Sequence, residues 1–147
     1  MANIGIIVGS VYGNAQNAAE EAETFLTNEG HDVQVHTDPD VDLLHDHDGF
    51  LVVTSTTGAG DVPPNLELFV ADARDAMPLI PNKKFAVIGL GDSSYGESYC
   101  GAGKELFALF SELQGNAITD LVSIDAMETF APEEDVLAWL GEHHTQF

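Results

Sequence analysis

Apolar runs that suit buried strands alternate along this chain with segments of helical periodicity, and this alternation restricts the possible folds more than any other feature. Several of the runs are almost continuously apolar, as expected for parallel strands that are covered on both faces. The alternation predicts an α/β fold, a doubly wound parallel sheet of about five strands with helices on both faces. Trp139 falls at helical spacing with apolar neighbours and is expected in the core. The strand-like runs are Ile4–Val8, His31–His36, Gly49–Thr54, Phe85–Leu90 and Ala117–Ile124.

Proline and glycine mark the ends of the helical segments. Pro63-Pro64 and Pro132 stand where helices are expected to begin, and proline is favoured in the first helical turn. Gly30 and Gly115 follow helical patterns and are predicted to cap the carboxyl ends of those helices. The chain of 147 residues contains no internal repeat or linker. We therefore expect residues 1–147 to form one domain.

Acidic residues dominate the charge of the chain. Its 25 Asp and Glu residues stand against 4 Lys and Arg residues, which gives a formal net charge of −21. This charge argues against nucleic acid or an anionic membrane as a partner and favours a basic protein. The same composition suits a solvated surface in a salty cytoplasm, and the two interpretations are compatible. No apolar run approaches the roughly 18 residues of a membrane span and no basic leader precedes the first strand, so we expect a cytoplasmic protein.

Few residues of this chain suggest a metal centre. Cys100 is the only cysteine, which rules out an internal disulfide or a multi-cysteine metal site built from this chain alone. His and Asp alternate over His45–Asp48, which we interpret as a solvated connection before a strand, with a metal site as the alternative. We predict no metal ligands, so any redox chemistry needs a bound organic cofactor.

Ligands of doubly wound sheets bind beyond the carboxyl ends of the strands. Three segments should meet there, namely Ser10–Ala15, Ser55–Asp61 and Gly91–Cys100. The first precedes a helix expected from about Gln16, whose unpaired N–H groups and positive dipole suit an anion. It contains no Lys or Arg, so a phosphate there would be held by backbone groups and hydroxyls. An ordinary strand-to-helix turn explains this segment alone equally well.

The other two segments suit the remainder of a nucleotide-like ligand. Ser55–Asp61 offers hydroxyls for a polyol chain and glycines that are free to change peptide orientation. Gly91–Cys100 contains Tyr95 next to small residues, and its ring can stack on a flat ligand ring. Together the three segments predict a ligand with a phosphate, a sugar-like chain and a flat ring.

These three segments resemble those of the flavodoxin family. Ser10–Asn14 is similar to the family's phosphate loop and Ser55–Gly58 to its second flavin loop. Gly91–Tyr95 reads as the family's GDSSY signature and is followed by Cys100–Ala102, where flavodoxins commonly have Cys-Gly-Ala. The match covers essentially the whole chain, and its uninterrupted last strand region resembles the short-chain form, in particular the small MioC/YqcA-type branch. The resemblance implies a single flavodoxin-like domain with the strand order 2-1-3-4-5.

The resemblance implies a noncovalent FMN that carries single electrons, with no catalytic residue or metal of the chain's own. Ser10 is implied to bind the phosphate, Tyr95 to stack on the outer face of the isoalloxazine and Gly58 to present its carbonyl to the flavin N5–H. The implied partners are a basic flavodoxin-reductase-type donor and redox acceptor proteins, which a monomer would meet transiently. The positions implied to hold FMN are Ser10, Val11, Tyr12, Gly13, Asn14, Ala15, Ser55, Thr56, Thr57, Gly58, Gly91, Asp92, Tyr95, Tyr99 and Cys100.

Departures from the family pattern leave other functions open. Tyr12 and Ala15 replace two threonines of the phosphate loop, which lowers phosphate affinity by about 1–3 kcal/mol if their hydrogen bonds are not replaced. Thr57 stands in place of an inner aromatic residue, so we expect the flavin to be stacked on one side. An extra residue between Tyr95 and Cys100 leaves open which N–H group contacts the ring. An open inner face would suit an FMN-dependent NAD(P)H reductase, and the lost hydroxyls would suit a flavin-free protein-interaction module.

Overall fold

A parallel sheet forms the centre of the computed structural model, which describes residues 2–9, 13–55, 62–91, 101–125 and 131–147. The strands are β1 (Asn3–Gly9), β2 (Asp32–His36), β3 (Gly49–Ser55), β4 (Lys84–Gly91), β5 (Asn116–Ala117) and β6 (Val122–Asp125). They lie in the order β2-β1-β3-β4-β5, and β6 also pairs with β4. Each of these pairs is parallel, so the predicted doubly wound sheet of order 2-1-3-4-5 is confirmed.

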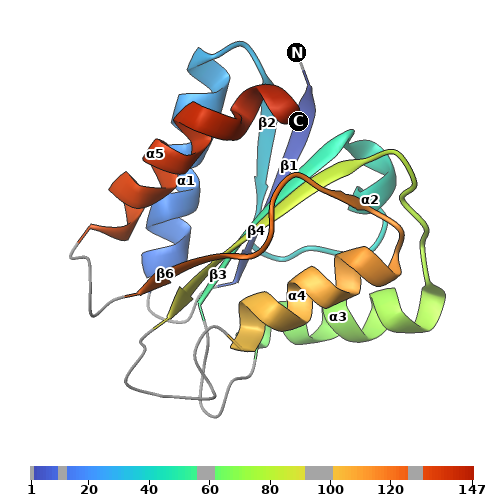
Figure 1. Ribbon diagram of the computed structural model, residues 1–147. Helices are drawn as coiled ribbons and strands as arrows, with labels where there is room; N and C mark the ends of the chain where they lie inside the picture. Colours follow the sequence, from blue (N-terminus) through green and yellow to red (C-terminus); the bar gives the residue numbers. More distant parts are fainter. Residues whose placement is uncertain (1, 10–12, 56–61, 92–100, 126–130) are drawn as a thin grey trace.

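Helices cover both faces of the sheet, as predicted. They are α1 (Asn14–Asn28), α2 (Leu43–Asp46), α3 (Pro64–Ala76), α4 (Gly101–Glu112), α5 (Pro132–His143) and the 3-10 turn η2 (His144–Gln146). Figure 1 shows α1 and α5 on one face and α3 and α4 on the other. Proline stands in the first turn of α3 and of α5, which confirms both predicted starts. None of the helices in the described ranges has the length and apolar composition needed to cross a membrane.

The edge next to β4 differs from the prediction, because the expected strand Ala117–Ile124 is split into β5 and β6. Phe85 pairs with Ala117 and Ile88 with Val122, so the edge contains two more residues than β4 between these pairs. The hydroxyl of Thr119 donates to the Asp120 carbonyl (2.9 Å) within the extra stretch. Extra residues on one strand of a pair form a bulge, and bulges are common at the edges of sheets.

Two hydrophobic clusters fill the space between the sheet and its helices. Under α3 and α4 the ring of Phe110 contacts those of Phe50, Phe69 and Phe85, with centroids 5.8, 6.5 and 5.4 Å away. The cluster under α1 and α5 is different, because α1 contributes small side chains that let the helix lie close to the strands. These fully buried residues are Ala15, Ala18, Ala19 and Ala22.

Glycine caps one of the two predicted helix ends. Gly30 has φ 95° and follows α1, as expected for a residue in the left-handed region. The prediction for Gly115 is wrong, because Gln114 takes the left-handed position after α4, with φ 70°. Gly115 is needed for space instead, since a Cβ there would lie 2.8 Å from Phe85 Cδ1.

The prediction that Trp139 lies inside the core is wrong, because the residue lies at the rim of the core. Its side chain is partly buried and packs against the cluster under α1 and α5. The indole stacks on the ring of His143, one helical turn further along α5, with centroids 4.7 Å apart and planes 15° apart. The side chain therefore stays partly accessible.

The solvated interpretation of His45–Asp48 is wrong for His47, although the other three residues of the run are exposed. His47 is 4% exposed, and a Cβ on Gly5 would lie 2.6 Å from its Cδ2. The His47 Nδ1–H donates to Asn3 Oδ1 (2.6 Å), because Asn3 Nδ2 is itself a donor to a backbone carbonyl. The His47 Nε2 faces His36 Nε2 at 2.9 Å. Among the described residues, no three or more His, Cys, Asp or Glu side chains are placed to hold a metal.

The surroundings of three histidines lower their pKa values. Burial lowers the pKa of His47 below its ordinary value, and the neighbouring His36 imidazole lowers it further. Burial also lowers the pKa of His36, against the opposing effect of Asp40. For His31, burial and the nearby His144 both lower the pKa.

These shifts predict that the fold loses stability as the pH falls through the ordinary histidine pKa of about 6.5. Below that pH the unfolded chain binds more protons than the native state, so the free energy of unfolding rises with pH. Urea denaturation at constant ionic strength measures how steeply the free energy of unfolding changes between about pH 5.5 and 7.5. Ordinary carboxyl groups titrate below this range and do not contribute. We expect a smaller slope for His36→Gln/His47→Gln than for the parent protein. An equal slope in the two proteins would contradict this assignment.

Candidate functional site

The carboxyl ends of three strands lie side by side at one edge of the sheet. Gly9 of β1 pairs with Thr54 of β3, and Thr54 pairs with Gly89 of β4. The Ser55 hydroxyl donates to the Gly9 carbonyl (3.3 Å) and so joins the ends of β1 and β3 directly. Figure 1 shows α1 and α4 beginning beside the arrowheads of these strands. The segments predicted to form a ligand site therefore leave the sheet at neighbouring positions, with Gly91 closing β4.

The helix after β1 begins earlier than expected, at Asn14 and not near Gln16. Gly13 is its N-cap residue, with φ 89°, and its carbonyl accepts the first intrahelical bond from Asn17 N–H (2.9 Å). The N–H groups of the first turn have no intrahelical acceptor, and the positive end of the helix dipole lies at the same point. No acidic residue stands in this turn to occupy it. The start of α1 is therefore suited to an anionic group.

Glycine at the N-cap leaves room beside this turn. A Cβ built on Gly13 would meet no atom within 4 Å in the described part of the chain. Ala15 differs from Gly13 because its methyl group is fully buried against the sheet. Of Ala15, only the backbone can therefore face a ligand, which agrees with binding through dipoles and N–H groups.

The end of β1 requires glycine for space. A Cβ on Gly9 would lie 2.6 Å from Leu66 Cδ1 and would also contact the hydroxyl of Thr54. Leu66 and Thr54 are fully buried, and the Thr54 hydroxyl donates to the Ser55 carbonyl (2.9 Å). This close contact between β1, β3 and α3 sets where the first two loops leave the sheet.

Asn65 supports the site through two hydrogen bonds that the sequence does not predict. Its Nδ2 group donates to the carbonyls of Val8 (2.7 Å) and Thr37 (2.9 Å). One amide at the start of α3 thus holds the end of β1 to the segment that follows β2. The only sequence signal is a polar residue directly after Pro63-Pro64, which by itself reads as an ordinary helix start.

The helix after β4 approaches the sheet closely. A Cβ on Gly103 would lie 3.2 Å from the Cα of Gly89 and 3.1 Å from Leu121 Cδ1. Glycine on both the helix and the strand therefore lets α4 begin against the end of β4. This contact holds the start of α4 beside the end of β4, and the third predicted loop connects these two elements.

Of the predicted site residues, the structure brings Gly13, Asn14, Ala15, Ser55 and Gly91 to one edge of the sheet. The remaining predictions lie outside the described residues. They are Ser10, Val11, Tyr12, Thr56, Thr57, Gly58, Asp92, Tyr95, Tyr99 and Cys100.

Comparison with known proteins connects this arrangement to one family. A family model described as flavodoxin matches residues 6–139. Flavodoxin YqcA of Escherichia coli (strain K12) is 42% identical over 147 residues, which cover 99% of this chain and 98% of that protein. A solved mutant of flavodoxin from Pseudomonas aeruginosa is 39% identical over 95% of both chains, with a TM-score of 0.90. A Fusobacterium nucleatum flavodoxin bound to flavin mononucleotide shares the fold at 17% identity, with a TM-score of 0.77 over 100% of this chain and 99% of that one.

Proposed function

Since this chain belongs to the flavodoxin family, we propose that it binds FMN without a covalent bond and carries single electrons between proteins. The observation that carries the proposal is the start of α1, where Gly13 opens the helix beside the joined ends of β1 and β3. Flavodoxins are electron-transfer proteins, and we assign no catalytic residue to this chain. Bound FMN would supply the one-electron chemistry that the single cysteine and the remaining side chains lack.

The described residues fit the phosphate end of FMN. Backbone N–H groups of Asn14 and Ala15 would donate to phosphate oxygens, with the dipole of α1 adding to the attraction. Because the Ser55 hydroxyl donates to Gly9, its oxygen would accept a hydrogen bond from the ribityl chain. Tyr95 and Gly58, outside the described residues, would contact the isoalloxazine in the roles implied by the family resemblance.

The charge of the chain supports basic partners. A net charge of −21 would steer a basic reductase-type donor and basic acceptor proteins toward the flavin, and the rate would fall as salt is added. We propose a monomer that acts in the cytoplasm and meets these proteins transiently. Transient electron-transfer contacts are small, so they do not require a stable complex.

Titration of the apoprotein with FMN and with riboflavin tests the proposal. We expect one FMN per chain with micromolar or tighter affinity, and binding of riboflavin weaker by about tenfold or more because it lacks the phosphate. Absorption of the bound flavin follows both titrations. Absence of FMN binding at millimolar concentration would favour the flavin-free interaction module, and equal affinity for the two flavins would contradict the role of α1.

Acidic residues near the flavin are expected to lower its reduction potential. One negative charge at about 10 Å in water-like surroundings opposes an added electron by about 0.4 kcal/mol, or about 20 mV. Asp61, Asp92 and Glu97 belong to the predicted loops, outside the described residues. Neutralising all three should raise the potential by some tens of millivolts at low salt, whereas neutralising the exposed Asp72 and Asp75 of α3 should change it little. An unchanged potential in the triple variant would contradict the prediction.

A further inference from the structure

A groove of about 480 Å³ lies between β6 and α5. All four residues of β6 line it, although their side chains alternate between the two faces of the sheet. The groove therefore follows the edge of the strand. Within the described ranges β6 pairs with β4 alone, so its other edge has no neighbouring strand. From α5, the groove is lined by Asp135, Ala138, Trp139 and Glu142, which recur at helical spacing and so share one face.

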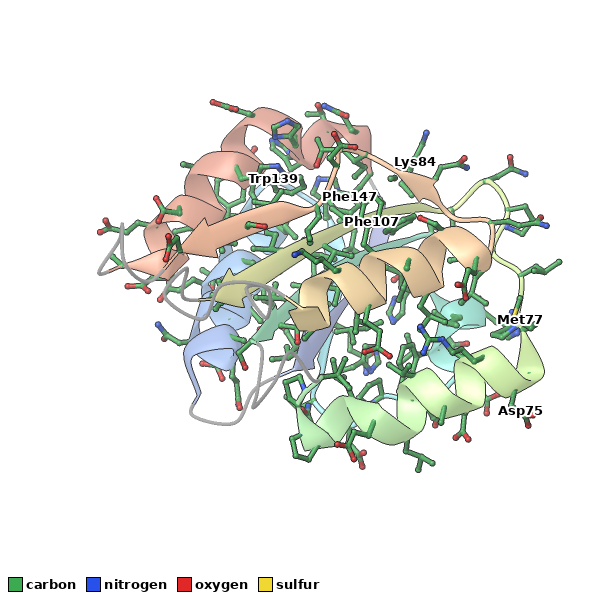
Figure 2. All side chains as sticks on the ribbon, turned by 60° about the horizontal axis from the view of Figure 1, so that its bottom comes forward. Asp75, Met77, Lys84, Phe107, Trp139 and Phe147 are labelled. Carbon is green, nitrogen blue, oxygen red and sulfur yellow. The ribbon has the colours of Figure 1, made fainter. Side chains whose placement is uncertain are left out.

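Trp139 gives this groove a flat apolar wall. Its indole is held in one orientation by stacking on His143 and by packing against the cluster that contains Ile124 of β6. Figure 2 shows Trp139 on α5 beside β6. A partly buried indole beside a strand edge that no other described strand pairs with can contact both the backbone and a side chain of an extended segment.

The charges around the groove all have one sign. Asp125, Asp135 and Glu142 contribute carboxylates to its lining. None of the four cationic side chains of the chain lies there, and Figure 2 shows Lys84 toward the far end of the sheet edge. Those four residues are Arg74, Lys83, Lys84 and Lys104.

We propose that this groove binds an extended segment of a partner protein, rich in Lys and Arg, as an added strand along β6. Main-chain hydrogen bonds to the strand edge would give affinity, as in other cases of strand addition. Cationic side chains on the α5 side would meet the carboxylates and the part of the Trp139 indole that His143 does not cover, and both contacts favour a cation. A second copy of this chain is disfavoured as the occupant, because it would bring the same carboxylates and a charge of −21 to the interface.

One end of the groove lies next to the candidate site. Asp125 at the end of β6 pairs with Gly91 at the end of β4, where the third predicted loop begins. A strand added along β6 would therefore carry its partner to the edge of the candidate site. The inference does not depend on FMN, since the groove is built from β6 and α5 alone.

A capped synthetic peptide of alternating valine and lysine or arginine serves as the probe, and the fluorescence of Trp139, the only tryptophan, reports on the groove. The protein is measured with and without added FMN at fixed ionic strength. We expect saturable binding in both states, weakened about tenfold in Asp135→Asn/Glu142→Gln. The matched control Asp72→Asn/Asp75→Asn removes the same charge from the far face of the sheet and should change the affinity by less than about twofold.

A second peptide, with proline in place of each valine, keeps the charge but cannot donate main-chain hydrogen bonds from those positions. We expect it to bind at least about tenfold more weakly than the first. Equal binding of the two peptides would overturn strand addition. Equal losses of affinity in the two double variants would also overturn the proposal, because overall charge and not the groove would then attract the peptide. Absence of saturable binding would also overturn the proposal, as would a stable dimer that the peptide dissociates, because a second copy would then occupy β6.

Discussion

The substitution Gly9→Ala is expected to lower both the stability of the fold and its affinity for FMN. A Cβ at this position would lie 2.6 Å from Leu66 Cδ1 and would contact the Thr54 hydroxyl. Both side chains are fully buried, so neither can move without disturbing β3 or the start of α3. Overpacking of this kind costs about 1–3 kcal/mol in the free energy of unfolding. We also expect FMN to bind about tenfold more weakly, because the phosphate loop leaves the sheet directly after Gly9.

The matched control for this change is Gly141→Ala. Gly141 is an exposed residue of α5, and a Cβ there would meet no atom within 4 Å in the described part of the chain. Alanine in a helix is favoured over glycine by about 0.5–1 kcal/mol, so stability should rise while FMN affinity stays the same. Urea denaturation and FMN titration measure both quantities. Parent-like behaviour of Gly9→Ala would contradict the requirement for space at the end of β1.

The substitution Phe110→Ala is expected to remove about 3–5 kcal/mol from the free energy of unfolding. Phe110 is fully buried, and its ring contacts those of Phe50, Phe69 and Phe85. Truncation leaves a cavity between the sheet and α4, and the three rings around it are themselves too tightly packed to fill it. Since small domains are stable by about 5–15 kcal/mol in total, this loss is a large fraction of the free energy of unfolding.

Leu68→Ala provides the comparison for Phe110→Ala. Leu68 is 73% exposed on α3, so its truncation should change stability by no more than about 0.5 kcal/mol. Equilibrium denaturation in urea measures both variants under the same conditions. A loss in Phe110→Ala as small as in Leu68→Ala would contradict the central role of the phenylalanine cluster.

The fold could be predicted because its strongest signals are local and repeated. Continuous apolar runs such as Gly49–Thr54 leave few alternatives to a buried parallel strand, and proline marks the starts of α3 and α5. The errors arise where tertiary contacts override local preference. Gly115 reads as a helix cap but is required by the nearby ring of Phe85, and His47 reads as solvated but packs on Gly5.

The candidate site was predictable in its location but not in its supporting contacts. Glycines and hydroxyl residues that follow three strands indicate one edge of the sheet, and β1, β3 and β4 end there together. The two hydrogen bonds of Asn65 and the tight contact of Gly9 with Leu66 join residues far apart in sequence. No spacing rule connects such positions, so they become visible only once the strands are paired.

An equilibrium redox titration of the FMN-loaded protein, followed by absorption, measures directly whether this protein carries single electrons. A one-electron carrier should take up electrons in two separate one-electron steps, with potentials distinct from those of free FMN. We also expect no steady-state oxidation of NAD(P)H without an added reductase. A single two-electron step together with such oxidation would contradict the carrier function and favour an FMN-dependent reductase.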